Sequence, residues 1–265
     1  MARTVQSFPL TETKDEKRQR KASVRAGLPL VADCKRYVVC LKWGTKYSPE
    51  YVNNLYNMVK RNLSVDHEFV CFTENSKGID PNIRIESLPD LPVTGWWYKP
   101  YFLSSDLPFD GTVLFLDLDL IIFRSIDKLF TYKPNNNFLI IRDFNRQVRQ
   151  NWDRMNSSVF RVTTGTHNAL YKDFTSNIQV HTRRYPGDQD FMYKNIKDYA
   201  FWPDEWMQSY KWEMRGRQEL VIVNGKRTFK SPGNPTILPD TSIAVFHGEP
   251  NIHDCIDAWP LQNWK

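Results

Sequence analysis

Two aspartates interrupt an apolar run between Gly111 and Ile122, which reads GTVLFLDLDLII. A continuous apolar run is typical of a strand covered on both faces, so we expect one buried strand here. Side chains two positions apart on a strand point to the same face, about 6.5 Å apart, so Asp117 and Asp119 could converge on one cation. Such a partner would offset the cost of burying two carboxylates. In the alternative, the strand ends at Leu116 and the aspartates begin a turn.

A histidine near the C-terminus could complete this set. Residues 242 to 246 have the apolar pattern of a strand and run directly into His247 and Gly248. A histidine at a strand end is equally compatible with a structural role, and the two aspartates are what favours a ligand role. Because carboxylate and imidazole ligands together suit Mn²⁺ and similar ions, we expect Asp117, Asp119 and His247 to bind Mn²⁺ or Mg²⁺.

The composition indicates a folded protein and excludes several classes. Of 265 residues, 41% are hydrophobic and 14% aromatic, which supports a substantial core. No apolar run approaches the roughly 20 residues of a membrane span, and the N-terminus lacks an apolar signal-peptide core. The four cysteines show no CxxC pair, so we expect reduced core thiols. These features predict a soluble, cytoplasmic protein.

The net charge of +6 gathers partly in an N-terminal segment. Residues 1 to 34 are polar and charged without periodicity, so we expect a charged arm there and one domain over residues 35 to 265. Basic residues are dense between Lys14 and Arg25. No nucleic-acid-binding signature accompanies them. We therefore expect no nucleic-acid partner, no transmembrane segment and at most a weak contact of this arm with an anionic membrane surface.

Strand and helix patterns alternate from Tyr37 onward. Ser48 and Pro49 predict the start of a helix, with Ser as N-cap and Pro at the first helical position. A strand–helix–strand order favours a right-handed crossover and a parallel sheet, hence an α/β fold with helices flanking a mostly parallel central sheet. Further strands are expected at 37–41, 69–72, 83–85, 138–141 and 156–162, and further helices at 125–130, 167–178 and 188–196.

Open α/β sheets bind ligands at the carboxyl ends of their strands, where the loop after Leu41, the aspartate pair and His247 would lie. Neither GxGxxG nor GxxxxGK[ST] is present, which argues against a dinucleotide oxidoreductase and a P-loop enzyme. A divalent ion at this edge would most naturally bridge a diphosphate and neutralise charge on the departing phosphate. Glycosyl transfer from a nucleotide sugar requires that chemistry.

Four short motifs, taken in order, resemble the GT-A fold glycosyltransferases related to family 8, the group of glycogenin and the bacterial lipopolysaccharide galactosyltransferases. The likeness extends loosely from Tyr37 to His253. The motifs are similar to the family's DxD region (Phe115 to Asp119), FNSG-like strand (Asn156-Ser157-Ser158), DQ segment (Gly187-Asp188-Gln189) and HG motif (Phe246 to Pro250).

The resemblance implies a single Rossmann-like GT-A domain and transfer of a hexose from a UDP-sugar, with retention at the anomeric carbon. The acceptor would be a glycan, a lipid-linked molecule or a protein. Asp188 is a candidate for stabilising positive charge on the sugar. The implied site residues are Leu41, Trp43, Tyr47 and Lys99 for the nucleotide, Asn156, Asp188 and Gln189 for the sugar, and Asp117, Asp119 and His247 for the metal.

One departure from the family pattern concerns the diphosphate. The family commonly has a lysine shortly after HG, whereas this chain reads Asn251-Ile252-His253, so His253 or Lys99 could take that role. Two other functions stay open. One is a non-catalytic module that binds a nucleotide sugar or a glycan on the same fold. The other is a metal-dependent nucleotidyltransferase. Such an enzyme would need a phosphate-binding loop rich in Gly, Arg and Lys early in the chain, for which Lys42-Trp43-Gly44 is a poor substitute.

Overall fold

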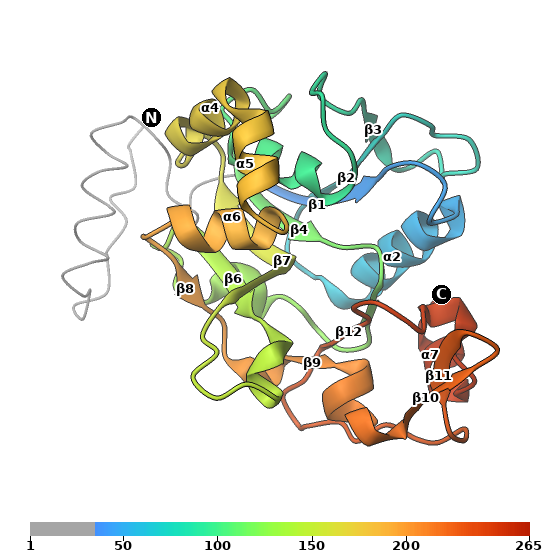
Figure 1. The fold of residues 1–265 in the computed structure, drawn as a ribbon. Coiled ribbons are helices and arrows are strands. Elements are labelled where there is room, and N and C mark those ends of the chain that lie inside the picture. The colour runs from blue at the N-terminus through green and yellow to red at the C-terminus, as the bar shows by residue number, and fades with distance from the viewer. Residues whose placement is uncertain (1–34) are drawn as a thin grey trace, which may run out of the picture.

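A seven-stranded sheet forms the centre of the computed structural model, which describes residues 35–265 (Figure 1). The strand order is β3-β2-β1-β4-β7-β6-β8. The arm expected over residues 1–34 lies outside the described residues. The strands are β1 (Arg36–Lys42), β2 (Glu68–Thr73), β3 (Arg84–Glu86), β4 (Thr112–Leu116), β6 (Phe138–Arg142), β7 (Met155–Thr163) and β8 (Ala200–Phe201).

The sheet is mostly parallel, as expected. β1 pairs in parallel with β2 and β4, and β2 with β3. β7 is antiparallel to both of its neighbours, β4 and β6, so β6 runs in the direction of β4, and β8 is parallel to β6. Because β7 runs backwards, its first residues lie at the same edge of the sheet as the carboxyl ends of β1 and β4.

Helices cover both faces of this sheet. α2 begins at Pro49, as expected, although the Ser48 side chain makes no capping hydrogen bond. The helix expected over 167–178 ends at Ser176, and the chain continues into α5, which the sequence pattern did not predict. The α-helices are α2 (Pro49–Asn62), α3 (Lys128–Thr131), α4 (Asn168–Ser176), α5 (Ile178–Arg184), α6 (Asp188–Asn195) and α7 (Ala258–Asn263). Short helical turns are η2 (Gly95–Leu103), η3 (Phe144–Gln147), η4 (Asp204–Trp206), the π turn η5 (Tyr210–Met214), η6 (Arg217–Glu219) and η7 (Ile252–Asp254).

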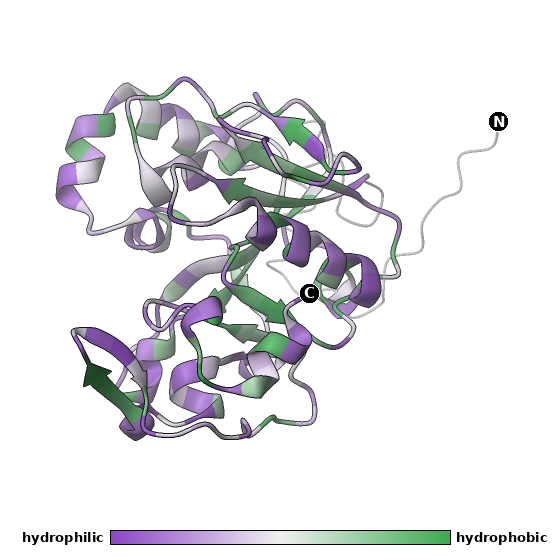
Figure 2. Cartoon of the chain, turned by 90° about the vertical axis from the view of Figure 1, so that its right-hand side faces the viewer, coloured by the Kyte–Doolittle hydropathy of each residue, from purple (hydrophilic) through white to green (hydrophobic). Residues whose placement is uncertain are grey.

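The two faces of each central strand enter different cores, which explains the continuous apolar runs. Val38 and Cys40 of β1 pack in one core with α2, β5 and β12, whereas Val39 and Leu41 pack in the other with η2, α4 and α6. The strands are accordingly hydrophobic inside a shell of more polar helices (Figure 2). Alternating side chains are buried on both sides because both sides are covered.

The run from Gly111 to Ile122 forms two strands in different sheets, so the expectation of one continuous strand is wrong. β4 ends at Leu116, as in the alternative, and β5 (Leu120–Ile122) pairs antiparallel with β12 (Ile243–Val245), which pairs with β9 (Met207–Ser209). The chain changes partner at the aspartates: Asp117 N donates to Ser158 O on β7 (2.8 Å), whereas Asp119 O accepts from Phe246 N (2.9 Å). The second sheet keeps Leu120–Ile122 buried, so the pattern stays apolar.

Arg161 on β7 is fully buried and ties the connection after α3 to the sheet. Its guanidinium donates hydrogen bonds of 2.8 to 3.2 Å to five backbone carbonyl oxygens. Carbonyls at the end of a helix have no intrahelical donor, so the arginine supplies donors that this turn lacks, although the Lys133 carbonyl also accepts from Asn136 N. The acceptors are the carbonyls of Leu129, Phe130, Tyr132, Lys133 and Asn136.

The remaining elements complete the C-terminal part of the fold. β10 (Leu220–Val223) and β11 (Lys226–Phe229) form a hairpin beside the three-stranded sheet. Cys40, Cys71 and Cys255 are buried free thiols, as expected, while Cys34 lies outside the described residues. Among the helices of residues 35–265, none combines the length and apolar character needed to cross a membrane.

Candidate functional site

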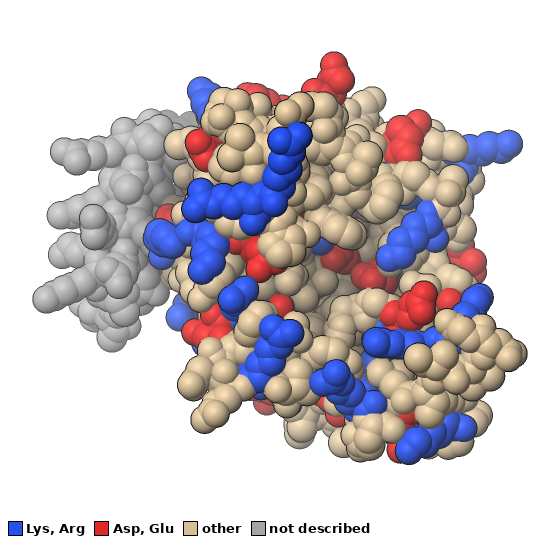
Figure 3. All heavy atoms as spheres, viewed as in Figure 1, with Lys and Arg blue, Asp and Glu red and all other residues tan. Residues whose placement is uncertain are grey.

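A cavity of about 540 Å³ opens at the carboxyl edge of the central sheet. In the space-filling view, acidic side chains lie within a hollow near the centre of this face, with basic side chains around it (Figure 3). Every candidate site residue from the sequence lines this cavity except His253. The segments that supply its walls are 41–47, 96–99, 117–119, 156–158, 186–190 and 247–248.

Lys99 and Asp117 form a buried ion pair at the centre of the site. Lys99 Nζ lies 2.8 Å from Asp117 Oδ1 and also donates to the carbonyl (3.1 Å) and hydroxyl (3.2 Å) of Ser157. Burial acts to lower the pKa of Lys99, but the charges of Asp117, Asp188 and Asp119, with the Asp117 hydrogen bond, together outweigh it and the pKa is raised. Lys99 is therefore a permanent cation that fixes Asp117 against the start of β7.

Asp119 is held by a tyrosine from the loop after β1. Tyr47 donates its hydroxyl proton to Asp119 Oδ2 over 3.0 Å. Burial and the neighbouring charge of Asp117 raise the pKa of Asp119 to about 6, and the Tyr47 hydrogen bond opposes that rise. Two adjacent carboxylates of this kind repel each other, and a bound cation would relieve the repulsion.

Asp188 presents a free carboxylate oxygen from the first turn of α6. Asp188 is buried, and its Oδ2 has no hydrogen-bond partner within residues 35–265. Burial raises its pKa, while the Lys99 charge and the Ser157 hydroxyl act to lower it. A helix N-terminus also favours the ionised form. The unsatisfied oxygen can accept a hydrogen bond from a ligand hydroxyl or face a developing positive charge.

Gln189 and Asn156 flank this acid. Gln189 Nε2 donates to Asp143 Oδ2 over 3.2 Å, and Asn156 Oδ1 accepts from the backbone N of Ser158 over 2.9 Å. Both amides are thus oriented by one described contact each and keep other donors or acceptors for a ligand.

His247 lies in the cavity wall between two aromatic rings. It stacks on Phe144 with centroids 5.3 Å apart and meets Trp212 edge-on at 4.8 Å. Its Nε2 shares a 2.6 Å hydrogen bond with the Ser209 hydroxyl. Burial, together with the charge of Lys211, lowers the pKa of His247 to about 3, so the ring is neutral at physiological pH. A neutral imidazole is the form that binds metals.

The chemistry of these donors suits a divalent cation, although the donors do not yet converge. Two carboxylates and a neutral imidazole line one cavity, and burial and the neighbouring charge of Asp117 raise the pKa of Asp119. Within residues 35–265, however, no three carboxylate, imidazole or thiol side chains gather closely enough to enclose an ion. Asp117 is paired with Lys99, and His247 Nε2 with Ser209, which leaves Nδ1 as the ring nitrogen open to a ligand.

The structure does not bring His253 to this cavity. Its Nδ1 lies 2.5 Å from the hydroxyl of Tyr51, which does not line the cavity, and its side chain is half-exposed. Other residues of the site were not identified from the sequence. Trp96 lies at the cavity mouth, half-exposed, and Ser209 and Lys211 support the His247 side. Trp96 stands in a visible aromatic cluster, whereas Ser209 and Lys211 belong to a region without a readable motif.

Comparisons with known proteins identify the fold. No protein-family model and no curated protein sequence matches the chain. The galactosyltransferase LgtC, solved with donor and acceptor sugar analogues, is similar in structure with a TM-score of 0.59 and 13% identity, over 85% of this chain and 93% of LgtC. The chain has a glycosyltransferase fold. The likeness, at this identity, is one of fold, and it confirms the expected GT-A type architecture.

Two larger glycosyltransferases share this fold. GlyE of Streptococcus pneumoniae TIGR4 has a TM-score of 0.56 at 13% identity, over 82% of this chain and 56% of GlyE. The bifunctional glycosyltransferase WbbM has a TM-score of 0.53 at 12% identity, over 85% of this chain and 48% of WbbM. The chain therefore spans about half the length of each of these two proteins.

Proposed function

We propose that this protein is a glycosyltransferase that moves a hexose from a UDP-sugar to an acceptor hydroxyl with the help of a divalent cation. One observation carries the proposal: candidate residues scattered from Leu41 to His247 line a single cavity at the carboxyl edge of a sheet with a glycosyltransferase fold. Ligands of open α/β sheets bind at that edge.

The nucleotide side of the cavity is formed by the loop after β1. Leu41, Trp43 and Tyr47 line it, and aromatic faces of this kind can stack on a uracil ring. Mn²⁺ or Mg²⁺, when held by Asp117, Asp119 and His247, would supply positive charge to the departing diphosphate. Lys99 adds a fixed positive charge behind Asp117 and keeps that carboxylate in place.

Hexosyl transfer with retention needs little proton chemistry from the protein. The bond between the anomeric carbon and the diphosphate oxygen breaks, a bond from the acceptor oxygen forms on the same face, and the acceptor proton passes to the leaving diphosphate. The sugar carries positive charge during this exchange, and the unpartnered Oδ2 of Asp188 is suited to stabilise it. Gln189 and Asn156 are placed to bind sugar hydroxyls.

The test is release of UDP from a panel of UDP-hexoses with Mn²⁺, with and without EDTA. We expect turnover with at least one sugar, loss of turnover in EDTA, and a fall of about 100-fold or more in Asp119→Asn. Asp110→Asn, at an exposed position outside the cavity, is the matched control and should behave as the wild type.

Each outcome decides between the alternatives. Turnover that survives Asp119→Asn unchanged would contradict the role of the metal. Binding of UDP without turnover across sugars and acceptors would favour the binding module, and no binding of any UDP-sugar would contradict the proposal. The anomeric configuration of the product, read by NMR, tests retention.

A further inference from the structure

The π turn η5 packs directly against the His247–Gly248 side of the cavity. Its N-cap residue, Ser209, bonds the His247 ring, and Trp212 meets the same ring edge-on. π-helical turns are rare and occur frequently at functional sites. Lys211 lies in this turn, between the two residues that contact His247.

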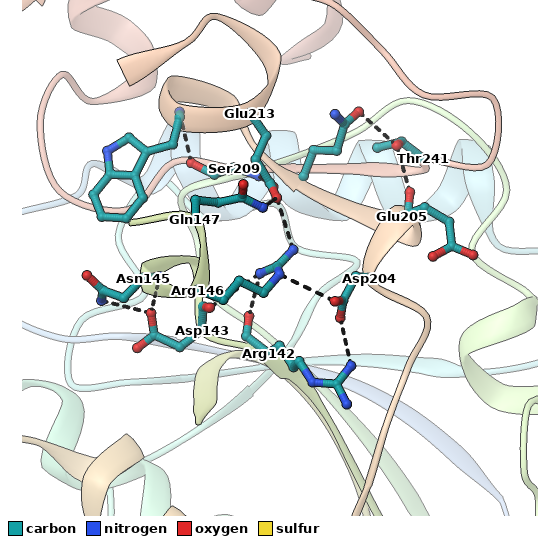
Figure 4. Close-up of polar contacts among 12 residues, drawn as sticks. Arg142, Asp143, Asn145, Arg146, Gln147, Asp204, Glu205, Ser209, Glu213 and Thr241 are labelled. Atoms are coloured by element: carbon teal, nitrogen blue, oxygen red, sulfur yellow. Dashed lines mark hydrogen bonds and ion pairs between the residues drawn. The ribbon is translucent and has the colours of Figure 1, made fainter. Parts of the chain in front are cut away.

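The other polar groups of the turn are fixed by partners. Glu213 accepts from Ser209 N (2.6 Å), from Gln147 Nε2 (2.6 Å) and from the Arg146 guanidinium (3.0 Å), which also pairs with Asp204 (Figure 4). The chain of contacts therefore runs from η3 through Glu213 to the turn that supports His247. Tyr210 donates its hydroxyl to Asp257 over 2.7 Å. The turn is thus held rigidly on both sides of Lys211.

Lys211 itself lacks such a partner. It is only 1% exposed, and its Nζ makes no hydrogen bond within the described part of the chain. Taking an ammonium out of water without a partner costs several kcal/mol in general. An anion that reached this ammonium would offset that cost.

The free space beside this ammonium lies at Gly248. A Cβ added to Gly248 would lie 3.9 Å from Lys211 Nζ and would meet no other atom within 4 Å. Gly248 lines the cavity, and so do Asp119 and Lys46, whose charges act on Lys211. Gly248 therefore touches both the cavity and the space next to the ammonium, and it has no side chain to fill that space.

The charges around the cavity define the ligand. Lys99 also lines the cavity, but its positive charge is paired with the Asp117 carboxylate. Lys211 is a buried cation whose Nζ has no hydrogen-bond partner within residues 35–265. A nucleoside diphosphate bound beside His247 would bring two negative charges to this end of the cavity.

We propose that Lys211 binds the diphosphate of the donor at the His247–Gly248 side of the cavity. This inference rests on the proposed function, which supplies the nucleoside diphosphate as ligand. The sequence shortly after the HG motif offers no lysine to contact the diphosphate. The proposal assigns that contact to Lys211 of η5, which precedes His247 by 36 positions.

The test compares binding of UDP, UMP and uridine, each with Mg²⁺, to the wild type, Lys211→Met and Lys172→Met. Methionine keeps the volume of the buried chain, and Lys172 is an exposed lysine of α4 that controls for the loss of one charge. We expect Lys211→Met to bind UDP about 10- to 100-fold more weakly, as for loss of a charge-assisted hydrogen bond. Uridine binding should be unchanged, UMP should lie between, and Lys172→Met should match the wild type.

Thermal unfolding without ligand separates this role from a structural one. Because an unpaired buried charge is unfavourable, Lys211→Met should melt at the same temperature as the wild type or higher. Unchanged UDP affinity in Lys211→Met would overturn the inference and leave the proposed function standing. An equal loss for UDP and uridine with a lower melting temperature would overturn it in favour of a structural role. A wild type that binds no UDP would overturn both.

Discussion

Lys99 Nζ lies 2.8 Å from Asp117 Oδ1, so the chain itself supplies a cation to the first aspartate of the site. Replacing Lys99 with Met should lower the free energy of unfolding by about 3 kcal/mol, because Asp117 would remain near other acids without its partner. Mn²⁺ should raise the melting temperature of Lys99→Met more than that of the wild type, since the ion would take the place of the lost charge. Thermal unfolding across a Mn²⁺ titration measures this, with Lys172→Met as control. Equal Mn²⁺ shifts in both proteins would show that Lys99 and the metal do not share Asp117.

The Tyr47 hydroxyl should set the pH at which the site becomes active. The pKa of Asp119 is raised to about 6 by burial and by Asp117, and its ionised form should be needed for the metal, so UDP release should rise with pH through about 6. Tyr47→Phe removes the hydrogen bond that holds this pKa down, so the acidic limb of kcat/KM should move upward by about one pH unit. Tyr56→Phe, outside the cavity, is the control. Superimposable profiles for Tyr47→Phe and the wild type would rule out this role.

Burial of His247 should make the metal-free protein less stable in mild acid. Its pKa is lowered to about 3, whereas the unfolded chain has the ordinary value of about 6.5. As the pH falls from about 6.5 towards 3, the unfolded state therefore binds a proton that the folded state does not, and the free energy of unfolding falls. Urea unfolding in EDTA between pH 7 and pH 5 measures the slope. His247→Asn should flatten it, and His67→Asn, at a half-buried position outside the cavity, should not. The same slope in His247→Asn and in the wild type would contradict the burial argument.

Arg161 should be among the most important residues for stability outside the site. Arg161→Leu would remove a donor from five backbone carbonyls, of which that of Lys133 keeps Asn136 N, and we expect the free energy of unfolding to fall by about 3 to 5 kcal/mol. Arg183→Leu, at an exposed position of α5, should change it by less than about 0.5 kcal/mol. Urea unfolding of the two variants gives the comparison. A small effect of Arg161→Leu would mean that water replaces the guanidinium at those carbonyls.

The central sheet and most of the site could be predicted from sequence because their signals are local. Strands such as 37–41 and 138–141 are apolar on both faces, and this pattern depends only on the helices that cover them. Asp188 and His247 belong to short motifs, at the start of α6 and just after β12, that can be recognised in the sequence. Both residues line the cavity.

What could not be predicted depends on contacts between distant segments. A strand that continues past Asp117 and a chain that switches to a second sheet have the same apolar pattern, because the partner strands, β7 and β12, are far along the sequence. The sequence pattern did not predict α5, because this helix exposes Val180 and has no clear apolar stripe. Lys211 looks like any surface lysine in the sequence, and only tertiary packing buries it.

Because the chain switches sheets between Asp117 and Asp119, the spacing of these two residues is also a requirement of the fold. Leu120 pairs with Val245 in a buried antiparallel register. Inserting or deleting one residue before Leu120 would move every side chain of β5 to the opposite face of its sheet. The interval between the two acids is therefore demanded by the architecture, whatever the acids do. The strand pairing thus fixes the spacing of these two positions but does not require carboxylates there, so their identity, and not their interval, is the part of the motif that the fold leaves free.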